Sequence, residues 1–181
     1  MKRSQMMEAQ AQAARMLEQL GIVLTSDESQ HIEVADFGLN DLHSQGLELI
    51  TYINTERYCA KELMLFSAQT CPEHQHPPIL DDPGKMETFR CRWGRVYLYV
   101  EGEQSSTIHA TIPVGSEAYY TVFHEIELQP GEQYTIQPGI KHWFQAGAEG
   151  AIISEFSSTS RDEYDIFTDT RIVRVPEMVV D

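Results

Sequence analysis

The sequence predicts an all-β fold of the sandwich or barrel type, with a helical arm at its N-terminal end. Short apolar runs separated by Gly and Pro follow one another from about residue 47 to residue 156, which is typical of such folds. One of these runs, residues 87–93, alternates between apolar and polar side chains, as a strand with one buried face does. Apolar residues at helical spacing occur over residues 4–20.

The composition indicates one acidic domain and excludes several classes of partner. The chain has 181 residues, 41% of them hydrophobic, which is enough to bury a core. Its 28 acidic residues exceed its 13 Lys and Arg, so the formal net charge is −15, which disfavours nucleic acid and anionic membranes as partners. Three irregularly spaced cysteines do not make a disulfide framework, and no apolar run approaches the roughly 20 residues that cross a bilayer. We therefore expect a soluble, cytoplasmic protein.

The N-terminal arm comes first along the chain. Residues 4–20 are predicted to form a helix, with Ser4 as its N-cap and Gly21 as its stop signal. Residues 25–46 are polar and irregular, with extended character near residues 32–37. This segment is expected to be an arm or covering layer, not a separate domain.

The strands of the barrel follow the arm. Gly94 ends one predicted strand, and the turns at Pro130-Gly131 and Pro138-Gly139 separate later ones. We therefore divide the chain into an N-terminal helix and arm over residues 1–45 and a barrel over residues 46–181. The predicted strands are residues 47–54, 61–68, 87–93, 96–100, 119–128, 134–137, 142–146 and 151–156.

His74, His76, Glu87 and His142 are the candidate metal ligands. His74 and His76 are spaced i, i+2, so on a strand both imidazoles point to the same side. Glu87 has the parity of Phe89, Cys91 and Trp93 and should face the core, where a carboxylate is costly unless a metal or an ion pair compensates it. Three imidazoles and one carboxylate suit Mn, Fe, Co, Ni or Zn. On an octahedral ion they leave two positions for adjacent substrate oxygens.

The spacing of these residues resembles the two motifs of the cupin family. The first motif runs H-x-H, then Glu, and then Gly after six residues, as Glu87 and Gly94 do here. The second is matched by Gly131, Gly139 and His142. Ten residues separate His76 from Glu87 in place of the usual three or four, which indicates a loop at the barrel mouth. The resemblance implies a cupin-type double-stranded β-helix, that is, a jelly-roll barrel.

Two longer blocks are similar to the D-lyxose isomerase family of cupin sugar isomerases. The first combines HQHPP at residues 74–78 with DPGKMETFRCRWG at residues 82–94, and the second is SEFSSTSRDEYD at residues 154–165. The similarity extends from about residue 45 to the end of the chain. It implies a Mn2+-dependent aldose–ketose isomerase that acts on D-lyxose and D-xylulose, and often on D-mannose and D-fructose. It also implies a cytoplasmic homodimer.

Isomerisation of an aldose assigns roles to further residues. It moves a proton between C1 and C2 through an enediol, so it needs a base at the carbon-bound proton and a group that stabilises the oxygens. Glu155 is our candidate base, and Lys85, at a position where the family carries a Lys, is our candidate cation. Periodicity does not determine whether Glu155 faces inward, and a solvated loop lysine is the alternative for Lys85. The candidate substrate contacts are Lys61, Arg161, Asp165 and the neighbouring Asp162, with loop charges or helix caps as the alternative. Trp93, Trp143 and Phe144 have two alternative positions, either lining the pocket or packing in the core.

Three other functions compete with an isomerase. An Fe(II) dioxygenase of the cupin type uses the same ligand set, and a non-catalytic sugar-binding cupin needs no acid–base pair. A sugar-phosphate isomerase is disfavoured because cations are scarce and the chain has no Gly-rich phosphate cradle. A small neutral sugar is therefore the expected partner.

Overall fold

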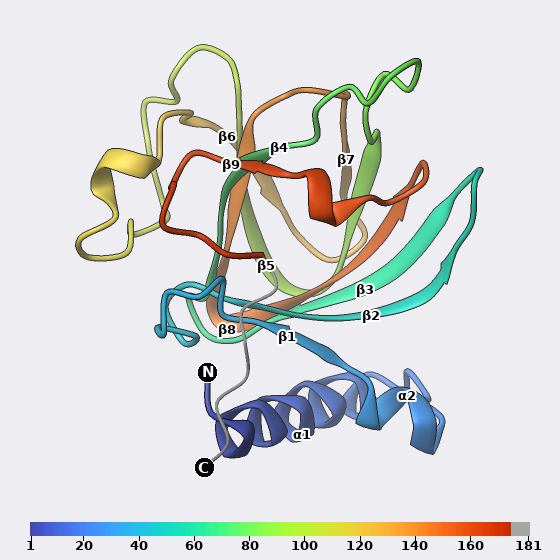
Figure 1. Cartoon of the computed structure of the whole chain (residues 1–181). Helices are drawn as coiled ribbons and strands as arrows, with labels where there is room; N and C mark the ends of the chain where they lie inside the picture. Colours follow the sequence, from blue (N-terminus) through green and yellow to red (C-terminus); the bar gives the residue numbers. More distant parts are fainter. Residues whose placement is uncertain (175–181) are drawn as a thin grey trace.

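The nine strands in residues 1–174, the part of the chain that the computed structural model describes, form one antiparallel sheet that curls into a barrel (Figure 1). They are β1 (Glu33–Ala35), β2 (Leu47–Asn54), β3 (Cys59–Leu65), β4 (Thr70–Gln75), β5 (Glu87–Val100), β6 (His124–Leu128), β7 (Gln133–Ile136), β8 (His142–Ser157) and β9 (Ile166–Phe167). Their order is β1-β2-β3-β8-β4-β9, and β5 pairs with β6, β7 and β8. The predicted all-β barrel is confirmed.

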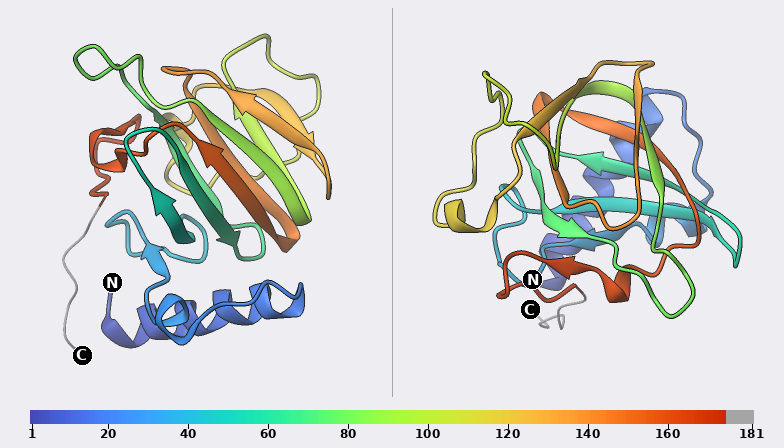
Figure 2. Two further views of the ribbon diagram at one scale, coloured as in Figure 1. Left: turned by 90° about the vertical axis from the view of Figure 1, so that its right-hand side faces the viewer. Right: turned by 90° about the horizontal axis from the view of Figure 1, so that it is seen from above.

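Strands β5 and β8 are long enough to contribute to both sides of the barrel (Figure 2). They pair along their whole length, from Glu87 opposite Ser157 to Val100 opposite His142. The first half of β5 also pairs with β7 and its second half with β6. The first half of β8 also pairs with β4 and its second half with β3. Register shifts on either side of Gly94 mark the corner where β5 passes from one half to the other.

Two glycines make this corner. Gly94 has a φ of +72° and Gly150 a φ of +92°, a conformation that L side chains rarely adopt. A Cβ atom on Gly94 would lie 2.0 Å from the carbonyl oxygen of Gly150, so no side chain fits between the strands. The predictions that strands end at Gly94 and again between residues 146 and 151 were wrong, because the glycines bend β5 and β8 without ending them.

The helices α1 (Arg3–Gln19) and α2 (Ser26–Gln30) lie on the outer side of the barrel, and α1 packs against the sheet next to β1, β2 and β3 (Figure 1). The predicted N-terminal helix is confirmed, and Gly21 follows it with a φ of +72°. The predicted N-cap was wrong: Lys2 occupies that position, and its backbone N–H donates to the side chain of Gln5 at 3.0 Å. The division of the chain at residue 45 stays a prediction.

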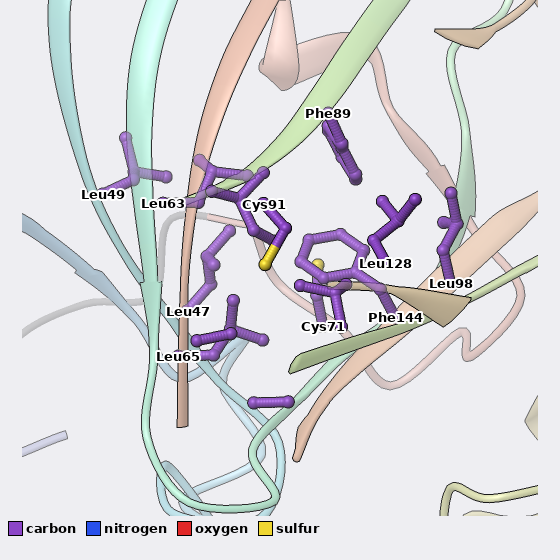
Figure 3. Packing of buried hydrophobic residues seen from close by; sticks show 14 of the residues in the cluster. Leu47, Leu49, Leu63, Leu65, Cys71, Phe89, Cys91, Leu98, Leu128 and Phe144 are labelled. Atoms are coloured by element: carbon purple, nitrogen blue, oxygen red, sulfur yellow. The ribbon is translucent and has the colours of Figure 1, made fainter. Parts of the chain in front are cut away.

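The apolar interior of the barrel comes from side chains on alternate positions of the strands (Figure 3). Phe89 and Cys91 point into it, as the alternation in residues 87–93 predicts. Trp93 was predicted to do the same, but it packs in the layer beside α1, because a register shift after Cys91 reverses the parity of β5. Other members of this core are Leu47, Leu49, Leu63, Leu65, Leu98, Leu128 and Phe144.

Several elements differ from the prediction in extent. The run 119–128 contains a strand only from residue 124, preceded by the short 3-10 helix η1 (Glu117–Tyr119). Strands β4 and β9 were not predicted, and a second short 3-10 helix, η2 (Asp162–Tyr164), precedes β9. The three cysteines are free and buried. Among residues 1–174, no helix is long and apolar enough to span a membrane.

Candidate functional site

His74, His76, Glu87 and His142 lie together at one end of the barrel interior. His74 is on β4 and His76 follows the end of that strand, while Glu87 begins β5 and His142 begins β8. One ring nitrogen from each histidine lies within 4.8 Å of those of the other two. Oε1 of Glu87 lies 2.9 Å from Nε2 of His142 and 3.3 Å from Nε2 of His76. All four side chains are buried.

The outer nitrogen of each imidazole already has an acceptor. Nδ1 of His74 and Nδ1 of His142 lie 2.8 Å and 2.9 Å from backbone carbonyl oxygens two residues upstream. Nδ1 of His76 lies 2.5 Å from Oδ1 of Asp165. For His74 and His142 these contacts favour the tautomer with the proton on Nδ1, which leaves the Nε2 electron pair directed inward. His76 lies between the carboxylates of Asp165 and Glu87, so it holds a proton on each nitrogen until a metal displaces the one on Nε2.

This tautomer puts two acceptors face to face. The electron pair on Nε2 of His142 meets a carboxylate oxygen of Glu87 across 2.9 Å, and this nitrogen is buried without a hydrogen-bond partner among the described residues. Two opposed acceptors in a buried site are costly, and a cation between them removes the cost. The donor set of three imidazoles and one carboxylate fits a divalent first-row metal.

Neighbouring charges shift the pKa values of the histidines in opposite directions. Burial, with the adjacent His142 and His76, lowers the pKa of His74 well below its usual value. Burial also acts to lower the pKa of His76, but Glu87 and Asp165 outweigh it and raise that pKa to about 9. His74 is thus a neutral, ligand-competent imidazole without help from a metal.

Lys85 bridges the histidine group and Glu155. Its Nζ atom lies 2.6 Å from Oε2 of Glu87 and 2.6 Å from Oε1 of Glu155. Burial acts to lower the pKa of Lys85, but Glu155 and Glu87 outweigh it and raise that pKa well above its usual value. Lys85 is therefore a buried ammonium group between two carboxylates, not a solvated loop lysine.

Lys61 and Glu155 both point into the barrel, which periodicity left open. They are opposite each other in the pairing of β3 with β8, and both are buried. Nζ of Lys61 lies 2.7 Å from Oδ2 of Asp162 and 2.8 Å from Oγ of Ser160. The neighbouring Glu62 instead accepts a hydrogen bond from Ser154.

A cavity lined by polar and apolar side chains connects these groups. Its polar lining includes the candidate ligands His74, His76 and Glu87 together with Lys85, Glu155, Lys61, Asp162 and Asp165. Its apolar lining includes Phe37, Leu49, Phe89, Phe144 and Phe167.

The remaining candidates divide between the cavity and its surroundings. Asp165 borders the cavity and contacts His76, so it lies behind a candidate ligand. Arg161 lies outside: its side chain is 39% exposed and pairs with Asp82 at 3.0 Å, beside a smaller hollow of about 260 Å³. Phe144 lines the cavity, whereas Trp143 stacks on Tyr99 at 4.0 Å in a separate aromatic cluster.

Sequence reasoning missed several residues that line the cavity, among them Phe37 and Arg174. Phe37 reaches it from the segment after β1, and Arg174 reaches it from the segment after β9. Neither lies in a periodic run or near a motif. The only sequence signal for Arg174 was its positive charge, because the chain has only 13 Lys and Arg residues.

Comparison with known proteins shows what the chain resembles. A family model described as D-lyxose isomerase matches residues 25–181, so the similarity begins earlier than residue 45. The D-lyxose ketol-isomerase of Cohnella laeviribosi is 65% identical over 181 residues, which cover 100% of both chains. The D-lyxose/D-mannose isomerase of Thermosediminibacter oceani is 62% identical over 178 residues, or 98% of each chain.

The fold also matches a solved structure. The L-ribose isomerase of Cellulomonas parahominis superposes with a TM-score of 0.80 at 14% identity, covering 95% of this chain and 94% of that one. At this identity the match shows a common fold, and it confirms the predicted jelly-roll barrel of the cupin type.

Proposed function

The chain belongs to the D-lyxose isomerase family, and from this premise we propose that it is a metal-dependent aldose–ketose isomerase that interconverts D-lyxose and D-xylulose. We extend the proposal to D-mannose and D-fructose, because one close relative is named for both aldoses. The observation that supports it best is the buried Lys85–Glu155 pair, which lies in the same cavity as His74, His76 and Glu87.

We assign the Nε2 atoms of His74, His76 and His142 and the carboxylate of Glu87 as the groups that would hold a divalent metal. Mn2+ is our choice among Mn2+, Fe2+, Co2+, Ni2+ and Zn2+, all of which suit these donors. When bound, such an ion supplies Lewis-acid stabilisation of negative charge on two adjacent sugar oxygens.

The residues around this centre would carry out the proton transfer. Glu155 takes the proton from C2 of the aldose, which leaves an enediol across C1 and C2, and returns the proton to C1 to give the ketose. A second proton passes from O2 to O1, and we assign Lys85 as the group that donates to these oxygens. Lys85 also fixes the Glu155 carboxylate at 2.6 Å, and both side chains are shielded from water.

The charges in the cavity support a neutral substrate. Lys61 is paired with Asp162, and Lys85 is paired with Glu87 and Glu155. A phosphate would have to compete with these carboxylates for every cation, whereas hydroxyl groups bind to donors and acceptors alike. The acid–base pair also favours an isomerase over an Fe(II) dioxygenase or a non-catalytic sugar-binding protein, since neither of these needs it.

We further propose, from the family resemblance, that the protein acts as a homodimer in the cytoplasm. Sedimentation of the purified chain tests the first part, and fractionation of the producing cell tests the second.

The function is tested with the Mn2+-loaded protein and D-lyxose or D-mannose, with the ketose product as the readout. Glu155→Gln should retain metal and lose turnover, whereas His76→Ala should lose both. Glu149→Gln, on an exposed part of the same strand as Glu155, is the matched control and should behave like the wild type. Absence of turnover of any aldose by the metal-loaded wild type would overturn the proposal.

A further inference from the structure

Two segments far apart in the sequence close one side of the cavity. One is the stretch from β1 to Phe37, and the other is residues 166–174, which we term the C-terminal strap (Figure 1). β9 joins the strap to β4, and the backbone N–H of Val173 donates to the carbonyl of Phe37 at 2.9 Å. The rings of Phe37 and Phe167 lie 5.6 Å apart. The strap and the first segment are thus held together beside the cavity.

Arg174 extends from the strap into the cavity lining. Its side chain is 16% exposed, and its Nη1 atom lies 2.5 Å from Oε1 of Glu33. Its Nη2 atom lies 3.6 Å from Oδ2 of Asp162, which in turn lies 2.7 Å from Nζ of Lys61. These four residues, Glu33, Arg174, Asp162 and Lys61, form a continuous row that we call the polar wall.

Arg174, Asp162 and Lys61 of the polar wall line the cavity, whereas Glu33 lies behind Arg174. Lys61 is opposite Glu155 in the strand pairing, and Asp162 lies 4.0 Å from Nζ of Lys85. Arg174 is the next charged group beyond Asp162, and within residues 1–174 its ion pairs are with Glu33 and Asp162, not with Lys85 or Glu155. A sugar whose C1 and C2 lie beside Lys85 and Glu155 would therefore direct its other end along this wall.

An aromatic side chain reaches the same part of the cavity. Phe37 is 2% exposed and has a φ of +54°, an unfavourable conformation for a bulky residue. Strained backbone of this kind persists where the surrounding structure holds it and occurs preferentially at functional sites. The contacts of Phe37 with the strap supply that restraint. Its ring offers an apolar surface for the C–H groups of a sugar.

We propose that Arg174 is a specificity-determining residue that binds the terminal hydroxyl groups of the sugar, those remote from C1 and C2. The planar guanidinium presents several N–H donors in a fixed fork, and Asp162 beside it supplies acceptors, so the pair matches a hydroxyl that both donates and accepts. This inference rests on the proposed function, because that function places C1 and C2 beside Glu155.

The test compares a pentose with a sugar shortened at the far end. L-erythrose keeps the configuration of D-lyxose at C2 and C3 but is one carbon shorter. For Arg174→Met, kcat/KM on D-lyxose should fall by about 10- to 100-fold, the effect of losing a hydrogen bond to a charged group, mainly through a higher KM. On L-erythrose the same variant should lose less than about 3-fold, because the missing end makes no contact with residue 174. Arg174→Lys should recover part of the lost kcat/KM on D-lyxose, because it keeps the positive charge but lacks the planar guanidinium with its several N–H donors.

Two further variants separate recognition from a structural role. Arg95→Met removes a guanidinium that is 49% exposed and pairs with Glu127 far from the lining residues, so it should affect neither sugar. Glu33→Gln removes the anchor of Arg174 and keeps the guanidinium. If Arg174 only ties the strap in place, Glu33→Gln and Arg174→Met will lower activity equally on both sugars, and this result would overturn the proposal.

Equilibrium binding keeps this inference distinct from the proposed function. Calorimetry with D-arabinitol, the reduced form of D-lyxose, should show about 10-fold or more weaker binding to Arg174→Met than to the wild type, and erythritol should show little difference. Binding of D-arabinitol that depends on Arg174, without turnover of any aldose, would overturn the isomerase and support the recognition role. Binding of D-arabinitol that is unchanged in Arg174→Met, or no binding to the wild type, would overturn the role of Arg174.

Discussion

Glu48 is a buried carboxyl group in the layer between α1 and the sheet, and its replacement by Gln should change how stability depends on pH. Its side chain is 0% exposed, and its strand partners Val34 and Met64 pack in the apolar cluster beside α1. One carboxyl oxygen lies 3.2 Å from Nε2 of Gln69, and the other has no hydrogen-bond partner among the described residues. Burial raises the pKa of Glu48 from 4.5 to about 8, and the bond from Gln69 opposes this only in part.

The sign and size of the effect follow from this pKa. Between pH 4.5 and about 8 the folded chain keeps a proton on Glu48 that the unfolded chain has released. Stability from this group is therefore fully present below pH 4.5 and is lost as the pH rises to about 8. At about 1.4 kcal/mol per pKa unit, the loss is at most about 5 kcal/mol. Glu48→Gln carries no charge and avoids it.

Urea unfolding at a series of pH values from 5 to 9 measures the difference. The free energy of unfolding of Glu48→Gln should be close to that of the wild type at pH 5 and exceed it by several kcal/mol at pH 9. Taking the difference between the two proteins removes the effect of the general surface charge. Glu56→Gln, an exposed position in the β2–β3 hairpin, is the matched control and should show a constant difference. A wild-type to Glu48→Gln difference that does not vary with pH would refute the reasoning.

Three further substitutions have defined outcomes. Asp165→Asn should weaken Mn2+ binding by about 10- to 100-fold, because it replaces the carboxylate that contacts Nδ1 of His76 at 2.5 Å. Competition with a chelator measures the affinity, and an unchanged affinity would show that Asp165 does not support metal binding. Glu73→Gln should lower the free energy of unfolding by about 1–3 kcal/mol in urea, because the amide removes the negative charge that accepts hydrogen bonds from residues 121, 122 and 168 and lies 3.7 Å from Nζ of Lys141. A variant as stable as the wild type would show that this charge is unimportant. Gly94→Ala should lower the yield of folded protein and its thermal midpoint, since its Cβ would meet the carbonyl oxygen of Gly150 at 2.0 Å; a normal midpoint would mean that the corner can move.

The sequence predicted the candidate metal centre better than it predicted the rest of the cavity. Residues 87–91 of β5 alternate between inward and outward side chains, so the position of Glu87 inside the barrel could be predicted. The directions of Lys61 and Glu155 were not predictable in this way. Their strands are buried on both faces, with the barrel core on one side and α1 on the other, so apolar residues occupy positions of both parities.

Other features depend on contacts that no local pattern encodes. Trp93 changes sides because of a register shift, which comes from the pairing of β5 with β8 and leaves no signal in the alternation. Arg174 and Phe37 meet beside the cavity only after the strap has folded back over the barrel. The glycines at positions 94 and 150 interrupt the apolar pattern of the sequence. Only the structure shows that the strands bend at these glycines and do not end there.

The corner in β5 and β8 would make loading of the proposed metal a measure of folding. Glu87 and His142 lie at opposite ends of the β5–β8 ladder, opposite Ser157 and Val100, yet their side chains approach to 2.9 Å once the sheet has curled. No short fragment of the chain contains these two candidate ligands at that distance, so the complete set of proposed ligands exists only in the closed barrel. Free energy gained on metal binding is therefore added to the free energy of unfolding. Removal of the ion should thus lower the unfolding temperature of the whole barrel, and mutations far from the ligands that weaken the barrel should lower the apparent metal affinity by the same linkage.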